Sequence, residues 1–489
     1  MLKLAALLLI VASTEAAFSC TTTPITTTSP SGYVPPLNNV PVLVPLGTNC
    51  TYQFTIPSGY VLKLQFSADI KSNADMVTYT DSLNKAFYLQ GAATPYNNKE
   101  FWVSAGSSSI NVIGGTGTST FLAQYTFVSL NSFKQAKKLT TGNYFAVNSI
   151  LGAQYYTLTS AKNDKVVATV GQRASKTNDT ALDQVYVYDG DNIMTAKMIG
   201  RLSDLGFSPR AKSSGNSLSF VNFYSSTSSS SWVLGNDASA ISNLEKYLVI
   251  MTSLGTNINA NLKDLTTSGS AYTFICTDCS TFYINQLSFD SLGTISNLAY
   301  VTYRGMSPTH GMEKLINYTA MAFTNSQLPQ KIPTNMITLD VFMSTINVMT
   351  STVNDDTAWK KVVDGRKGYI FSPNLWNPST TNINYNEEFR NDTQLFTYQV
   401  NLNRLNFKAS SDSLRVRIGS GSGNPAVDNT YPKVTSSTGV VSAKGNYLNL
   451  AFGGSAGSDV RVGFQMTIAS SSSTIGLLAS LALTLFYVL

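Results

Sequence analysis

The chain has 489 residues and a formal net charge of +6; charged residues make up 12% of it and hydrophobic residues 43%. A low charged share beside so much apolar content excludes an intrinsically disordered chain and favours folded domains. Lysines and arginines are scattered, with no run longer than two, so the sequence gives no basic footprint for nucleic acid.

The N-terminal residues, MLKLAALLLIVASTEA, combine a lysine, an apolar run from Leu4 to Ala12 and small residues before a cleavage site. We expect a secretory signal peptide over residues 1–16, cut at Thr14-Glu15-Ala16, with Ser19 as the second choice. A buried N-terminal helix is the alternative, because the run is too short to span a membrane.

The C-terminal stretch IGLLASLALTLFYVL, residues 475–489, falls short of the roughly 20 apolar residues of a spanning helix and has no flanking basic residues. Small residues, Ala469 through Ser473, precede it. This pattern predicts a glycolipid (GPI) attachment signal over residues 470–489, with Ala469 or Ser470 as the attachment residue. A short tail-anchored helix is the alternative.

A strand-and-turn motif recurs along the chain at intervals of domain length. It reads DMVTYTDS up to Ser82, DQVYVYDG up to Gly190, LAYVTYRG up to Gly305 and DSLRVRIG up to Gly419. In three copies a Gly/Ser turn, an alternating strand, a small polar loop and a closing strand follow; the third copy lacks them.

Short alternating strands with frequent turn signals are typical of β-sandwiches. We therefore expect an all-β chain of four jelly-roll type sandwiches over residues 17–132, 133–259, 260–354 and 355–469, the third being degenerate. Residues 238–254 fit a helix or a strand equally well, and the Thr/Ser/Pro-rich residues 21–32 are expected to form an extended leader.

Four cysteines are an even number for an oxidising compartment, and they allow three pairings. We expect Cys20 to pair with Cys50 and Cys276 with Cys279. Asn-x-Ser/Thr acceptors for surface glycans occur at Asn49, Asn178, Asn317 and Asn391.

The stretch VPVLVPLGTNCTYQFTIPSGYVLKLQF, followed by DMVTYTDS, resembles the nematode CUB-like domain family, and residues 41–66 match its pattern. In the second unit DQVYVYDGDN, Leu202-Ser203 and SSGNSLSFVNF resemble CUB domains more generally, with Ser203 where many of them carry cysteine. The resemblance implies tandem CUB-like sandwiches. It also implies secreted or anchored proteins of epithelial surfaces, often linked to responses to pathogens.

The same resemblance raises calcium, which some CUB domains use to hold a partner's lysine. Asp183 stands at the middle ligand position, with Asp75 and Asp412 at the same point of their units. Calcium needs six to eight oxygens, but Tyr224 and Ser225 occupy the region of the downstream acid. We therefore expect no metal and interpret Asp183 as an acid that caps a turn through backbone amides.

The sequence lacks most of the partner residues that a catalytic site would need. His310 is the single histidine and lies in a turn without a G-x-S-x-G elbow, and Cys276-x-x-Cys279 lacks further zinc ligands. The paired acids Glu387-Glu388 and Asp355-Asp356 could serve glycoside hydrolysis, but sequence neighbours point apart on a strand. Most aromatic residues are expected in the cores, and loop residues such as Trp102 and Trp376 could instead stack on sugars.

We therefore expect a non-catalytic recognition or adhesion protein without a cofactor, GPI-anchored on the extracellular side of the plasma membrane. Its partners would be an extracellular protein or glycan ligand and, through the lipid anchor, the outer membrane leaflet. The resemblance suggests a part in innate defence. A structural component of an epithelial or cuticular coat is the alternative, and a secreted hydrolase is the third.

Overall fold

The computed structural model describes residues 18–36, 38–91, 95–173, 179–207, 210–224, 228–264, 266–290, 298–421, 423–433 and 439–469. The expected signal peptide, the GPI-attachment signal and the residues Asn178 and Ser470 lie outside these ranges. The chain divides into two compact units: Met1–Ala168 with Asp179–Gly235, and Thr169–Asn178 with Asn236–Leu489.

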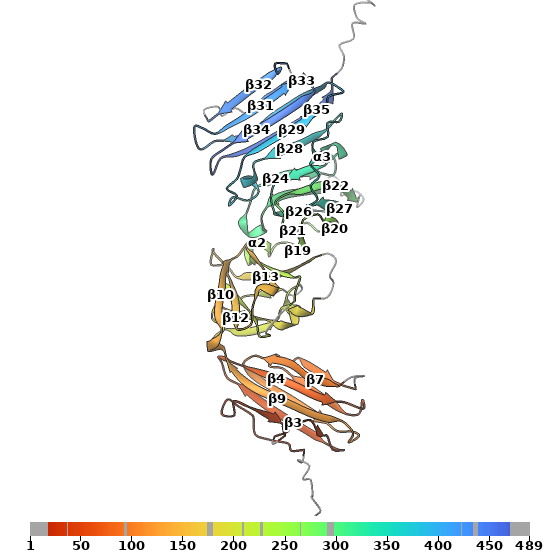
Figure 1. Cartoon of the computed structure of the whole chain (residues 1–489), viewed down its shortest axis with the longest axis vertical. Coiled ribbons are helices and arrows are strands. Elements are labelled where there is room, and N and C mark those ends of the chain that lie inside the picture. The colour runs from red at the N-terminus through yellow and green to blue at the C-terminus, as the bar shows by residue number, and fades with distance from the viewer. Residues whose placement is uncertain are drawn as a thin grey trace, which may run out of the picture. The chain divides into compact units, whose positions relative to one another are not determined.

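Each unit contains two β-sandwiches, and all four sandwiches among the described residues share one topology (Figure 1). When the eight main strands of a sandwich are numbered in chain order, one sheet runs 1-8-3-6 and the other 2-7-4-5. This is the arrangement of a jelly roll, in which antiparallel strands close two sheets around one core. The expected all-β fold class is confirmed.

Sandwich 1 buries alternate side chains along its strands, as β3 shows with the strict exposed–buried pattern of NCTYQFTI. Its core includes Tyr52, Leu64 and Phe66. One sheet consists of β1 (Ser31–Val34), β9 (Thr120–Ser129), β4 (Tyr60–Asp69) and β7 (Tyr96–Val103), with β2 (Val42–Leu43) beside β9; the other of β3 (Asn49–Ile56), β8 (Gly106–Ile113), β5 (Met76–Thr80) and β6 (Ala86–Leu89).

The expected leader, residues 21–32, is part of sandwich 1 rather than a separate extended segment. Ile25 bridges to Phe54 in parallel, with its amide donating to Gln53 O at 2.8 Å, and β1 begins at Ser31. A disulfide joins Cys20 to Cys50 of β3. A single bridged residue leaves no periodic pattern in the sequence, which explains why composition alone pointed to a leader.

Sandwich 2 closes around Phe145, whose ring packs against Tyr156 at 5.3 Å and Phe220 at 5.4 Å. Its first sheet has β11 (Tyr144–Ala146), β18 (Trp232–Asp237), β13 (Val166–Arg173) and β16 (Ala211–Lys212); its second has β12 (Gln154–Thr159), β17 (Ser217–Asn222), β14 (Val185–Asp189) and β15 (Lys197–Arg201). An additional strand, β10 (Lys134–Thr140), pairs in parallel with β12. The helix α1 (Leu202–Leu205) follows β15.

Sandwich 3 has all eight strands, although the sequence suggested a degenerate unit. They are β20 (Asn257–Asp264), β27 (Ser344–Ser351), β22 (Phe282–Asp290) and β25 (Gln330–Ile332) in one sheet, and β21 (Ser270–Cys276), β26 (Met336–Phe342), β23 (Tyr300–Gly305) and β24 (Lys314–Thr319) in the other. The Gly/Ser loop is absent because Met343 alone connects β26 to β27.

Residues 238–254 contain both elements that the sequence allowed, the short helix α2 (Ala238–Ile241) and the strand β19 (Lys246–Thr252). β19 pairs in parallel with β21 and so extends sandwich 3. The expected boundary between residues 259 and 260 falls inside β20.

Sandwich 4 packs Trp359 of helix α3 (Asp356–Trp359) against Phe389 and Phe464 in its core. Its sheets consist of β28 (Lys367–Phe371), β35 (Asp459–Ile468), β30 (Phe396–Asn406) and β33 (Val440–Gly445), and of β29 (Tyr385–Arg390), β34 (Tyr447–Gly453), β31 (Ser413–Gly419) and β32 (Val427–Pro432). The four recurring sequence motifs become β5, β14, β23 and β31, which are strand 4 of each sandwich.

A buried carboxylate ties the loop between strands 7 and 8 to the start of strand 4 in three sandwiches. Asp412, 2% exposed, accepts hydrogen bonds from Ser455 N at 2.8 Å, Ser458 Oγ at 2.5 Å and Ala409 N at 2.8 Å. Asp75 and Asp179 bind the corresponding loops of sandwiches 1 and 2.

Burial by itself raises the pKa of Asp412, but the hydrogen bonds from Ser458, Ala409 and Ser455 outweigh it and hold the pKa well below its usual range. The ionised form is therefore the one that the fold stabilises. Removing it leaves several donors without an acceptor, which is costly in a buried place.

We predict that Asp412→Ala destabilises the second unit by about 3 kcal/mol at neutral pH, because charge-assisted hydrogen bonds are lost together. Since the folded pKa is depressed, this contribution is complete above about pH 4 and disappears as the pH falls through the folded pKa. Calorimetric unfolding at several pH values measures it. Asp183→Ala, at an exposed position, is the control; an equal effect of both changes would contradict the role of Asp412.

Candidate functional site

Asp183 lies exposed in the short 3-10 helix Thr180–Gln184, and Asp179 instead takes the loop-binding role in sandwich 2. The carboxylates of Asp75 and Asp412 accept hydrogen bonds from amides and hydroxyls of the loops in their own sandwiches. Within the described ranges no three acidic, histidine or cysteine side chains gather in a way that could hold a metal ion.

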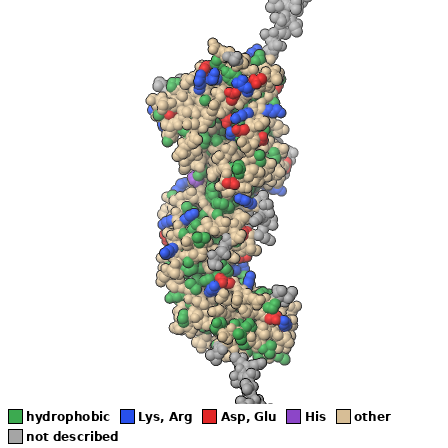
Figure 2. Space-filling view, viewed as in Figure 1, with side chains coloured by type: hydrophobic (Ala, Val, Ile, Leu, Met, Phe, Trp, Pro, Cys, Tyr) green, Lys and Arg blue, Asp and Glu red, His purple; other side chains and the backbone are tan. Residues whose placement is uncertain are grey.

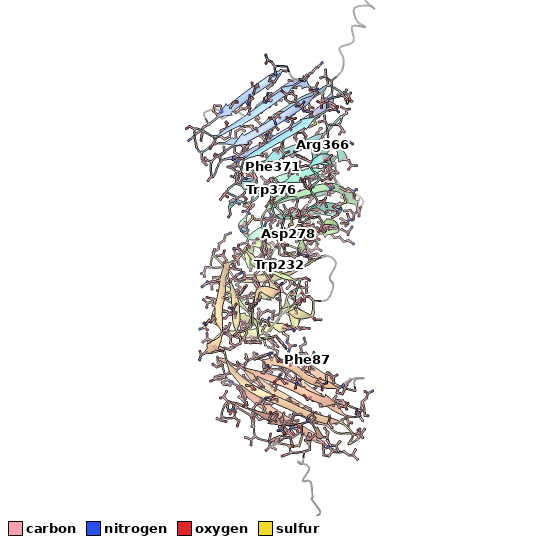
Figure 3. All side chains as sticks on the ribbon, viewed as in Figure 1. Phe87, Trp232, Asp278, Arg366, Phe371 and Trp376 are labelled. Atoms are coloured by element: carbon pink, nitrogen blue, oxygen red, sulfur yellow. A yellow bond between two sulfur atoms is a disulfide. The ribbon has the colours of Figure 1, made fainter. Side chains whose placement is uncertain are left out.

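Trp102 and Trp376, which the sequence left as possible sugar-stacking residues, are both buried. Trp376 is 0% exposed and its ring contacts that of Phe371 at 5.1 Å (Figure 3). Trp102 stacks on Phe223 at 5.2 Å, and its carbonyl accepts a hydrogen bond from the Tyr186 hydroxyl at 2.9 Å. Neither ring is available to a ligand.

Tyr186 comes from the motif DQVYVYDGDN and belongs to an apolar cluster that sandwiches 1 and 2 share within the first unit. Next to it, the buried guanidinium of Arg201 lies 4.6 Å from the centre of the Phe87 ring and 3.7 Å from the Asp81 carboxylate (Figure 3 labels Phe87). This motif therefore serves the packing of the two sandwiches.

The cysteines pair as expected, since a second disulfide joins Cys276 to Cys279. Of the described glycan acceptors, Asn49 and Asn317 are exposed and Asn391 is half-buried. His310 is exposed at the end of a 3-10 turn, with Nδ1 3.2 Å from Ser307 Oγ. Because Ser307 is fully buried, its hydroxyl cannot reach a substrate. Ala469 donates its amide to Leu395 O.

The acids Asp356 and Glu387, which belong to different pairs in the sequence, meet at one lysine. Lys331 of β25 lies with Nζ 2.9 Å from Asp356 Oδ1 and 3.0 Å from Glu387 Oε1. Tyr283 of β22 donates its hydroxyl to Asp356 at 2.7 Å, and the Trp359 indole donates to Glu387 at 3.2 Å. We call these five residues the Lys331 cluster.

Two hollows flank the Lys331 cluster. One, of about 530 Å³, includes Asp278, Cys279 and Asn354 in its lining; the other, of about 250 Å³, is lined by aromatic rings such as Tyr369, Phe371 and Tyr385. The cluster itself forms part of both walls.

The lowered pKa of Asp356 does not suit the part of a catalytic acid in hydrolysis. Burial raises the pKa of Asp356, but hydrogen bonds from Lys331 and Tyr283 and the lysine charges lower it to about 2. Glycoside hydrolysis needs one carboxyl that stays protonated near neutral pH. Both oxygens of Glu387 also accept hydrogen bonds, one from Lys331 and one from Trp359. The arrangement is therefore that of a structural ion pair.

A hollow of a different character lies on the outer face of the 1-8-3-6 sheet of sandwich 3, and we call it the amide groove. Its volume is about 580 Å³. Its lining includes Asn259 and Asn261 of β20, Asn285, Gln286 and Ser288 of β22, Asn325, and Asn347 and Met349 of β27. No lysine, arginine, aspartate or glutamate is part of this lining.

The face of the molecule seen in Figure 2 is poor in charge. Figure 2 shows uncharged side chains over most of the visible face, with basic and acidic ones scattered singly or in small groups. Among the described residues no helix is long and apolar enough to cross a membrane.

Residues 15–131, which include sandwich 1, match the family of CUB-like domains. This match supports the resemblance seen in residues 41–66. No curated protein sequence matches the chain.

Among solved structures, the CUB1-EGF-CUB2 domain of human MASP-1/3 is 12% identical, with 42% of this chain and 98% of that one covered and a TM-score of 0.18. The CUB1-EGF-CUB2 domains of rat MASP-1 are 10% identical, with 67% and 99% covered and a TM-score of 0.19. The full extracellular region of zebrafish Gpr126/Adgrg6 is 9% identical, with 68% and 52% covered and a TM-score of 0.19. Scores this low do not establish a common fold over the aligned length.

We predict that Lys331→Met destabilises the second unit by about 2 kcal/mol at pH 7, because two carboxylates lose their shared cation in a partly buried place. Since Asp356 has a folded pKa of about 2, its part of this stabilisation is complete above about pH 4 and is lost as the pH falls through 2. Denaturant unfolding followed by tryptophan fluorescence at pH 7 and pH 2 measures the difference.

Lys360→Met is the matched control, because Lys360 also bonds Asp356, at 3.4 Å, but is more exposed. We expect it to cost less than half as much. A penalty for Lys331→Met that stays constant down to pH 2 would contradict the ion-pair assignment.

Proposed function

We propose that the chain is a non-catalytic recognition protein of the extracellular surface. The carrying observation is that the large amide groove lies on an open sheet face and has no titratable group in its lining. Such a surface can bind, but its lining has no acid or base, so the Ser288 hydroxyl has no lining group that could activate it.

Three further observations support this proposal. Of the acids that the sequence offers for catalysis, Asp356 and Glu387 are ion-pair partners of Lys331, and Glu388 is an ion-pair partner of Arg390. Both disulfides suit an oxidising compartment. Residues 15–131 match CUB-like domains, which are extracellular recognition or adhesion modules as a class.

The proposal includes the four-sandwich division, glycans on Asn49, Asn178, Asn317 and Asn391, and a GPI anchor at Ala469 or Ser470. It excludes a calcium requirement at Asp183. A part in defence against pathogens rests on the family resemblance alone. Four sandwiches on one anchored chain would combine several modest contacts, since tethering raises the effective concentration of each.

We predict saturable binding of the full chain, purified in detergent from secretory cells, to at least one member of an array of glycans and extracellular proteins. Binding is expected to persist in a calcium chelator and in Asp183→Ala. The absence of any saturable binding would favour a structural surface coat instead.

We predict that phosphatidylinositol-specific phospholipase C releases the protein from intact cells. Surface labelling before and after treatment measures the release, and the double change Ala469→Trp/Ser470→Trp, which removes the small residues of the attachment site, should abolish surface display. Retention of the parent protein after the enzyme would contradict the anchor and favour a tail-anchored helix.

A further inference from the structure

We propose that the amide groove of sandwich 3 is a binding site for a neutral oligosaccharide. This inference rests on the proposed recognition function and adds its place and the chemical class of its ligand. The recognising groups are the carboxamides of β20, β22 and β27.

Strand register brings these side chains into two rows across three strands. Asn259 lies opposite Met349, which lies opposite Gln286; two residues along, Asn261 lies opposite Asn347, which lies opposite Ser288. Because side chains alternate along a strand, both rows point away from the core. Neighbouring strands are about 4.8 Å apart, so Asn261, Asn347 and Ser288 form one polar row. In the other row the Met349 side chain separates Asn259 from Gln286.

In the row of Asn261, Asn347 and Ser288, the carboxylate of Asp290 orients the amides; Asp290 follows Ser288 by two residues on β22. Asp290 accepts both contacts from Asn347 Nδ2, at 3.1 and 3.2 Å, and Asn347 Oδ1 in turn accepts Asn261 Nδ2 at 2.7 Å. Asp290 can only accept, so it fixes the direction of this chain of amides. Asn261 Oδ1 is left as an acceptor, held in place before a ligand arrives, which lowers the entropic cost of binding.

The donor and acceptor set fits a neutral polyhydroxyl ligand. A carboxamide offers an acceptor and two donors close together, which suits the neighbouring hydroxyls of a sugar ring. A charged ligand would find no counter-charge in the lining. An apolar ligand would strip the amides of water without replacing the hydrogen bonds.

The equivalent faces of other sandwiches carry charged side chains instead. In sandwich 1 Lys63 and Glu100 form an ion pair at 2.8 Å on this face, and in sandwich 4 Arg461 lies 4.9 Å from the Tyr369 ring. Asparagine is disfavoured in strands, so strand formation does not account for Asn259, Asn261 and Asn347. Amides also occur on the equivalent face of sandwich 4, at Gln399 and Asn401, but there Arg461 lies on the same sheet.

The groove asparagines are not acceptors for N-glycosylation, because none of them begins an Asn-x-Ser/Thr pattern. The glycan acceptor of this sandwich, Asn317, lies on β24 of the other sheet. A glycan attached there starts from the opposite side of the sandwich and leaves the groove open.

The test measures binding of the full chain to cellohexaose, chitohexaose, mannohexaose and maltohexaose, with a heparin hexasaccharide as the charged comparison. We expect at least one neutral hexasaccharide to bind. The double change Asn261→Ala/Asn347→Ala should weaken that binding at least tenfold, and the isosteric Asn261→Asp should weaken it as well. The matched control is Gln399→Ala/Asn401→Ala, which removes two amides from strand 3 on the same face of sandwich 4.

Unchanged affinity in both groove variants, or loss of equal size in the control, overturns the inference. Binding of the heparin fragment alone, or of protein ligands alone, also overturns it but leaves the recognition function standing. No saturable binding to sugars or proteins would overturn both. Thermal unfolding of each variant shows that the loss is not one of folding.

Discussion

The two-residue period of the β-strand is the constraint on which the molecule depends. Successive side chains of a strand point to opposite faces of its sheet, and in each sandwich one of these faces lies against the core. In sandwich 3 the strands β20 and β27 hold Leu262 and Ile346 at inner positions and Asn261 and Asn347 at outer positions. A slip of one residue would exchange the two sets, so the register that builds the core also builds the groove.

Six acids of this chain hold its loops and side chains in place. Asp75, Asp179 and Asp412 hold loops, Asp290 orients an amide row, and Asp356 with Glu387 surrounds Lys331. Asp75 and Asp412 each accept several backbone and hydroxyl donors, so two charges fix two loops. The lining of the amide groove, in contrast, contains no charged side chain among the described residues.

The sequence predicts the local parts of this structure well, because they obey local rules. Strand 4 of each sandwich is visible as an alternating run that ends in a turn. The amide groove was not predicted, because its rows cross β20, β27 and β22, which are separated in the sequence. Sandwich 3 seemed degenerate because Met343 replaces a whole loop. The meeting of Lys331, Asp356 and Glu387 could not be predicted, since only the fold brings together residues so far apart in the chain.

The segments that enter the sandwiches also protect them. Strand 2 is the edge of its sheet, and the entering segment pairs in parallel with it at Ile25 in sandwich 1, through β10 in sandwich 2 and through β19 in sandwich 3. In sandwich 4 the same edge strand, β29, carries the paired charges of Glu388 and Arg390 instead. Unpaired edges invite aggregation. A fragment that starts at strand 1 would therefore expose the edge of its strand 2. We expect a single sandwich to stay soluble only when the preceding segment is kept.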